Sequence, residues 1–222
     1  MENEMTAEDY LAEAMDSSIW PEQVKNLKKS IELDPDNIDP YIFWGVELYN
    51  KAQAGNDLLL FEEAAEKFKK VIEIDPHEYH SYVYQGACLA SLARPRHDLS
   101  LYSRAMELYR SAILRDPGEA FAYACLSDSL IQVAKITKEK SLLLEAIDNL
   151  LIAETITEGI GMFNLACAYS VLGDIPNALS YFEKALQVDE DIREKIEADT
   201  DFDNIRVLPE FKLLLDQYKP LS

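Results

Sequence analysis

Hydrophobic residues recur along most of this chain at spacings of three, four and seven, which place them on one face of an α-helix. This helical pattern of hydrophobic residues is interrupted at polar or proline-containing turns such as 55–57 and 94–96. It is interrupted again at the Asp-Pro pairs 34–35, 75–76 and 116–117. Proline disfavours a helical conformation in the residue before it, so each Asp-Pro pair separates two helices. The pattern therefore predicts an all-α protein built from pairs of helices.

The helix pairs follow an internal repeat. IELDP at 31–35, IEIDP at 72–76 and ILRDP at 113–117 each begin 41 residues after the last. The same shift aligns residues of matching size in both helices of each unit: Tyr41, Tyr82 and Tyr123; Gly45, Gly86 and Ser127; Ala64, Ala105 and Ala146; Phe68, Tyr109 and Leu150. We expect the small residues to let paired helices approach closely while the large ones fill the gap. Asp57 and Asp98 stand where a carboxylate caps the second helix.

These positions resemble the tetratricopeptide repeat, a 34-residue helix pair with a large residue, Leu-Gly, Tyr, Ala, Phe, Ala and Pro at set places. Ala178, Phe182 and Ala185 match the later part of that pattern. The first three full repeats, at 41 residues, are seven residues longer than the family pattern, which we interpret as about one extra turn on each helix. The resemblance implies a superhelical solenoid of antiparallel helix pairs with no common catalytic activity. Within one solenoid, 1–222, it gives an N-terminal capping repeat 6–35, long repeats 39–76, 79–117 and 120–158, a 34-residue-type repeat 160–190 and C-terminal capping helices 191–222.

The C-terminal sequence resembles the closing module of a bacterial and organellar group of these repeat proteins. FNLACAYSVLGD at 163–174 is followed by DTDFDNIRVLPEFKLLL at 199–215. The resemblance implies that five apolar residues fold over the open face of the last repeat: Phe202, Ile205, Leu208, Phe211 and Leu214.

Composition argues against several function classes. The 222 residues carry 41 acidic and 21 basic side chains, and the formal net charge of −20 repels nucleic acid and anionic membranes. No apolar run approaches the roughly 20 residues of a membrane span, and the start MENEMTAEDY is acidic where a signal peptide is basic and then apolar. We expect no membrane insertion and a cytoplasmic location, or an organellar stroma or matrix after removal of a targeting segment not present here.

The sequence contains no motif that points to catalysis. Phosphate-binding loops, nucleophile elbows and dinucleotide fingerprints are missing from it. Cys88, Cys125 and Cys167 lack the spacing of a zinc site or disulfide framework, and we expect them in the core. His77 and His80 are three residues apart at a helix start, a spacing that could hold a metal, but no third ligand is evident nearby. We predict no enzyme activity, no cofactor and no metal.

In this repeat family the first helices line a concave face, so the resemblance also gives the candidate site. Counting from the large aromatic residue of each first helix assigns these groove residues: Ile42, Val46, Tyr49, Val83, Ala87, Ala90, Ala124, Asp128, Ile131, Phe163, Asn164 and Cys167. Chaperone adaptors of the family hold a C-terminal carboxylate with lysine, arginine and asparagine, and only Asn164 matches such a position here.

An apolar groove suits an amphipathic helix or an extended apolar segment. We therefore expect an interaction scaffold or adaptor whose partner is a protein or peptide of apolar and basic character. Other interpretations remain open at this stage. The groove could be partly filled by the chain's own terminal helices, or it could carry an apolar small molecule. The acidic turns between repeats could also dock onto the basic turns within repeats of another copy, which would give a homo-oligomer.

Overall fold

The chain folds into helices that pack as consecutive pairs, in two compact units. The computed structural model describes residues 5–188, 192 and 200–218, so the predicted segments 160–190 and 191–222 lie partly outside the described residues. Unit 1 (Met1–Arg115) contains α1 (Ala7–Asp16), α2 (Trp20–Leu33), α3 (Asp39–Gly55), α4 (Leu58–Ile74), α5 (Tyr79–Ala93), the short 3₁₀ helix η1 (Arg94–Arg96) and α6 (Leu99–Arg115). Unit 2 (Asp116–Ser222) contains α7 (Ala120–Thr137), α8 (Lys140–Ile156), α9 (Met162–Leu172), α10 (Ile175–Val188), the 3₁₀ helix η2 (Thr200–Phe202) and α12 (Pro209–Gln217).

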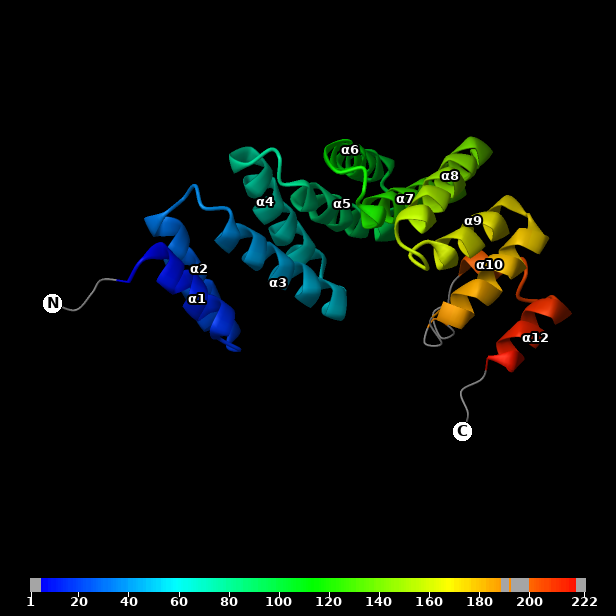
Figure 1. Cartoon of the computed structure of the whole chain (residues 1–222), viewed down its shortest axis with the longest axis horizontal. Helices are drawn as coiled ribbons and strands as arrows, with labels where there is room; N and C mark the ends of the chain where they lie inside the picture. The colour runs from blue at the N-terminus through cyan, green and yellow to red at the C-terminus, as the bar shows by residue number, and fades with distance from the viewer. Residues whose placement is uncertain (1–4, 189–191, 193–199, 219–222) are drawn as a thin grey trace. The chain divides into compact units, whose positions relative to one another are not determined.

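Helices that are neighbours in sequence lie side by side (Figure 1). In unit 1 these pairs are α1 with α2, α3 with α4 and α5 with α6, and in unit 2 they are α7 with α8 and α9 with α10. No strand occurs in the part of the chain that the structure describes. The predicted all-α class is confirmed.

The second helices of three successive pairs have equal lengths. α4, α6 and α8 each contain 17 residues and begin at Leu58, Leu99 and Lys140. α9 and α10 are shorter, with 11 and 14 residues. Because α4, α6 and α8 start 41 residues apart, each outward position of one helix has a counterpart in the other two.

The repeated Asp-Pro phrase is bonded to the repeated tyrosine. The hydroxyl of Tyr41 donates a hydrogen bond to the carbonyl oxygen of Pro35 at 3.4 Å, and Tyr82 makes the same bond to Pro76 at 3.1 Å. Arg115 adds to the second turn, since its Nε donates to the Pro76 carbonyl at 2.7 Å and its Nη2 donates to the Tyr82 hydroxyl at 2.7 Å. In the first two turns, therefore, the tyrosine holds the Asp-Pro turn against the helix that follows it.

Close approach of paired helices depends on small residues, as predicted. A Cβ atom added to Gly86 would lie 2.7 Å from a ring carbon of Tyr109, and one added to Gly45 would lie 2.9 Å from the ring of Phe68. In unit 2 the corresponding Ser127 donates a hydrogen bond from its hydroxyl to a carbonyl of α8 at 3.1 Å. The glycine positions therefore leave room for a large side chain of the facing helix.

Carboxylates cap two of the second helices, α4 and α6. Asp57 accepts a hydrogen bond from the backbone amide of Leu59 at 2.9 Å, and Asp98 accepts one from Ser100 at 2.9 Å. Both predicted caps are confirmed. They satisfy amides that have no partner within the helix.

C-terminal residues cover the last helix pair. Residues from this segment that are buried or partly buried against α9 and α10 are Phe202, Ile205, Phe211, Leu208 and Leu214. The ring of Phe211 stacks on Phe182 of α10, with the two centroids 4.7 Å apart. We call these residues, with the side chains of α9 and α10 that they contact, the C-terminal cluster.

Candidate protein-binding surfaces

An apolar hollow opens in unit 1 between α1 and α3. It has a volume of about 350 Å³ and is lined by Leu11, Met15, Asp39, Ile42, Phe43 and Val46. Asp39 is the one ionisable residue in this set, and Met15 is 58% exposed. We call this site the α1–α3 hollow.

Local sequence explains why these side chains face one another. α1 starts with a capping box, in which the Asp9 amide donates to the Thr6 hydroxyl at 3.2 Å and the Thr6 amide donates to the Asp9 carboxylate at 2.8 Å. Leu11 and Met15 then follow four residues apart, a spacing that places them on one side of the helix. The two predicted groove residues of α3, Ile42 and Val46, have the same spacing.

Sequence reasoning placed Ile42 and Val46 at a binding surface but missed three other lining residues: Leu11, Met15 and Phe43. The apolar pair in α1 was visible as an i, i+4 spacing, but the weak match of 6–35 to the repeat gave no reason to place α1 beside the groove. Phe43 is adjacent to a predicted position, and its half-buried side chain turns toward the hollow.

The other predicted groove residues of unit 1 expose little surface. Three of them are buried on α5: Val83, Ala87 and Ala90. Tyr49 is half-buried and packs edge-on against the rings of Phe61 and Tyr84, with centroids 5.8 and 5.5 Å apart. These side chains contribute mainly to packing within unit 1.

In unit 2 the predicted groove residues lie partly under the chain's own C-terminal residues. Those that are buried are Ala124, Ile131 and Cys167, and those that are half-buried are Asp128, Phe163 and Asn164. Phe163 packs edge-on against Phe202 at 5.9 Å, and Cys167 belongs to the C-terminal cluster.

A polar network holds η2 against the faces of α7 and α9 that carry the predicted groove residues. Lys135 lies eleven residues after Ala124, on the same side of α7, and forms an ion pair with the buried carboxylate of Asp201. Ser170 of α9 donates from its hydroxyl to the Asp201 carbonyl at 2.6 Å, and the Asn204 amide group donates to the Ser170 carbonyl at 2.6 Å. On α9, therefore, terminal residues of the chain occupy the predicted groove face, as one of the open interpretations supposed.

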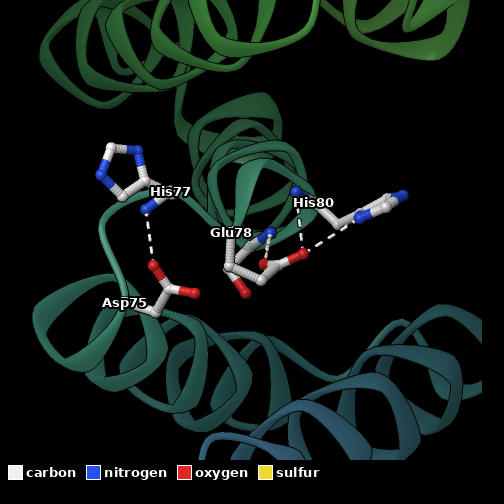
Figure 2. Close-up of polar contacts among 5 residues, drawn as sticks. Asp75, His77, Glu78 and His80 are labelled. Atoms are coloured by element: carbon white, nitrogen blue, oxygen red, sulfur yellow. Dashed lines mark hydrogen bonds and ion pairs between the residues drawn. The ribbon is translucent and has the colours of Figure 1, made fainter.

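The histidine pair does not form a common ligand set. Figure 2 shows the rings of His77 and His80 pointing away from each other. The His77 amide donates to Asp75 at 2.9 Å, and Glu78 accepts from the Ser81 amide at 2.7 Å while its other oxygen lies 3.0 Å from Nδ1 of His80. Within the described ranges, no group of three His, Cys, Asp or Glu side chains could hold a metal ion. The carboxylates at this turn instead hold the start of α5.

The thiols of Cys88 and Cys125 are not activated. Burial raises the pKa of the Cys88 thiol to about 12, and burial also raises the pKa of the Cys125 thiol, with a further contribution from Asp128. Reactive cysteines need the opposite shift, because the thiolate is the nucleophile.

Comparisons with known proteins agree with this architecture. Residues 160–192 match the sequence model of the tetratricopeptide repeat. The structure of MamA residues 41 to the end, from Desulfovibrio magneticus RS-1, superposes with a TM-score of 0.65 at 18% identity, over 87% of this chain and 97% of that chain. This chain has the tetratricopeptide-repeat fold.

Two further solved tetratricopeptide-repeat relatives show the same likeness. PilW, described as a widely conserved type IV pilus biogenesis factor, has a TM-score of 0.61 at 14% identity, over 90% of this chain and 82% of its own. YrrB, described as a TPR protein with an unusual peptide-binding site, has a TM-score of 0.55 at 18% identity, over 86% and 90%. Curated protein sequences give no match. At these identities the likenesses establish the fold alone.

Stacked helix pairs of this fold make extended surfaces of the kind used in protein recognition. Proteins with this fold are generally scaffolds without catalytic activity. Among the helices that the structure describes, none has the length and apolarity required to cross a lipid bilayer.

Glu78→Ala should lower the free energy of unfolding by about 1 kcal/mol, the usual cost of removing a helix cap. The carboxylate holds two amides at the start of α5, those of His80 and Ser81. Urea unfolding followed by circular dichroism measures the change. Glu62→Ala, an exposed acid inside α4, removes the same charge without removing a cap, and equal effects of the two substitutions would contradict the capping role.

Proposed function

We propose that this protein is an interaction scaffold that binds an apolar segment of a partner protein in the α1–α3 hollow. The observation that carries the proposal is the lining of that hollow, in which apolar side chains surround a single carboxylate, that of Asp39. Apolar surface that gathers in one place on a strongly charged protein is a marker of a binding site, because its contact with water is unfavourable.

The hollow also indicates the chemistry of the segment. Apolar side chains would fill it, and a basic residue beside them would meet Asp39 in the first turn of α3. The net charge of −20 favours the same partner, since opposite charge raises the rate of encounter. YrrB, which has the same fold and is described as a peptide-binding protein, supports a role of this class.

A second candidate function is suggested by the size of the hollow. Its volume of about 350 Å³ falls within the range of about 300–1,000 Å³ that is common for small-molecule sites. An apolar small molecule carried there would leave the protein as a carrier rather than a scaffold. Native mass spectrometry of the protein purified from its own host would detect such a molecule as a fixed mass increment.

The test of the scaffold proposal is a double substitution in the hollow. Met15→Lys with Val46→Lys should reduce capture of the partner from a host lysate at least tenfold, because two cations would be buried against an apolar segment. Quantitative mass spectrometry of the captured proteins measures the loss. Leu59→Lys with Leu114→Lys is the matched control, since these leucines are 69% and 82% exposed on α4 and α6 and lie outside the hollow. Undiminished capture by the folded double variant would remove the hollow as the binding site.

A further inference from the structure

α8 has an apolar outer face. Leu144, Leu151 and Ile152 are 54%, 38% and 44% exposed, while Leu150 and Ala153 of the same helix are buried. Leu144 and Leu151 are seven residues apart, and Ile152 follows directly, so the three side chains lie on one side over two turns. We call these three residues the α8 outer patch.

The corresponding positions in the sister helices are polar. They are occupied by Glu62, Lys69 and Lys70 in α4 and by Ser103, Arg110 and Ser111 in α6. In α4 both lysines form surface ion pairs, Lys69 with Glu66 at 3.7 Å and Lys70 with Glu73 at 3.5 Å. The two sister helices therefore pack in their pairs with polar side chains at these three outward positions, so packing within a pair does not explain the apolar side chains of α8.

Carboxylates accompany the patch. Asp148 is exposed and lies between Leu144 and Ile152, four residues from each. Burial is the main cause of the raised pKa of Tyr169 in α9. The charges of Tyr181, Asp174 and Asp148 raise that pKa further. Lys140 lies one turn before Leu144 on α8, and Lys184 lies over the Tyr181 ring at 4.4 Å. An apolar surface is thus combined with negative charge.

We infer that the α8 outer patch is a docking surface for a basic amphipathic helix of a partner protein, distinct from the α1–α3 hollow. Leucine-like side chains at i and i+7 of such a helix would pack along Leu144 and Leu151, and its arginine or lysine side chains would pair with Asp148 and Asp174. The proposal does not depend on the function of the hollow.

Size and charge favour a helix over a second copy of the chain. Even a fully covered aromatic side chain buries only about 150–250 Å², so three part-exposed aliphatic side chains supply well under the roughly 800 Å² per partner of a standard interface. A symmetric contact between two copies would also place Asp148 of one copy near Asp148 of the other, on chains that each carry a charge of −20. A single basic helix meets neither difficulty.

The test uses a fluorescently labelled synthetic helical peptide with leucine on one face and arginine on the other, titrated with the full chain by fluorescence anisotropy. Leu144→Glu with Leu151→Lys installs the residues of α4 and leaves the net charge unchanged, and it should weaken binding at least tenfold. Leu59→Glu with Leu114→Lys is the charge-matched control at exposed leucines of α4 and α6, and its affinity should stay within twofold of the unsubstituted chain.

Charge gives a second measurement on the same peptide. Asp148→Asn should weaken binding and reduce its dependence on salt, because one ionic contact is lost. A peptide with glutamate in place of arginine should not bind. A scrambled peptide of the same composition, which keeps the charge but loses the apolar face, should bind much more weakly.

Several outcomes would overturn the inference. Equal affinity of the α8 double variant and the unsubstituted chain would do so, as would equal binding of the scrambled peptide. A dimer in sedimentation velocity that the α8 double variant dissociates would assign the patch to a second copy. Met15→Lys with Val46→Lys should leave peptide affinity within twofold. If it alone abolished binding, the peptide would belong to the hollow, and the α8 inference would fail while the proposed function stood.

Discussion

Phe211→Ala should lower the free energy of unfolding by about 3–5 kcal/mol, the usual cost of truncating a buried phenylalanine. The Phe211 side chain is 1% exposed and stacks on Phe182 at 4.7 Å, beside the buried ring of Phe202. Truncation removes this apolar contact and leaves a cavity that rigid neighbours on α9 and α10 cannot fill. Urea unfolding followed by circular dichroism would measure the change.

A matched substitution on the same helix separates this effect from a general weakening of α12. Leu213 is 59% exposed, so Leu213→Ala should change the free energy of unfolding by no more than about 0.5 kcal/mol. Hydrogen exchange of the α9 and α10 amides should become faster in Phe211→Ala and stay unchanged in Leu213→Ala. Equal behaviour of the two variants would mean that the C-terminal cluster does not support the last helix pair.

The helix pairs were predictable because their determinants are local and recur. Gly86 and Tyr109 could be paired from sequence by the 41-residue shift, since a small residue in one helix implies a large one opposite it. Asp57 could be assigned as a helix cap because it directly precedes a segment with apolar residues at helical spacing. Each of these signals needs only a few neighbouring residues, and the repeat presents it several times.

Accessibility of the groove could not be predicted in the same way. Val46 lines a hollow while Ala87, 41 residues later, is buried, although both were chosen by the same counting along a first helix. Whether such a side chain is covered depends on which other segment lies against it. For Val46 the neighbour is α1, which leaves the hollow open, and for Phe163 it is the segment that carries Phe202.

The acidic turns have a structural role that composition did not indicate. Their carboxylates suggested a charged edge for contact with another copy, yet Asp34, Asp75 and Asp116 each accept a hydrogen bond from the amide two residues later, at 3.3, 2.9 and 2.9 Å. Side-chain to backbone bonds of this kind are the ordinary reason for aspartate in turns. Turn formation is therefore a sufficient reason for aspartate at these three positions, and contact of the acidic turns with another copy stays a prediction.

The α8 outer patch could be found in the sequence, but only by comparing equivalent positions of the 41-residue repeat for differences rather than for similarity. Leu142, Leu143 and Leu144 are three consecutive apolar residues near the start of α8. Leu143 is buried whereas Leu144 is exposed, so only one of these two adjacent leucines belongs to the core. Comparing positions 41 residues apart for polarity, rather than for similarity, singles out Leu144 against Glu62 and Ser103.

Gly86→Leu should destabilise unit 1 by at least about 1–3 kcal/mol, the usual range for overpacking a core. The first added carbon already falls 2.7 Å from the Tyr109 ring, which is 2% exposed and held between helices, so neither group can move aside cheaply. Thermal and urea unfolding would both report the loss. Gly55→Leu is the control, because a Cβ at Gly55 meets nothing within 4 Å.

A double-substitution cycle tests the cause of that loss directly. The corresponding pair in unit 2 is Ser127 with Leu150, in which a residue with a Cβ faces a smaller side chain. Gly86→Ala should therefore cost less in a Tyr109→Leu background than in the unsubstituted chain, with a coupling between the two sites of about 0.5–3 kcal/mol. If the two substitutions were simply additive, Gly86 and Tyr109 would not be in contact, and the aligned small and large residues would need another explanation.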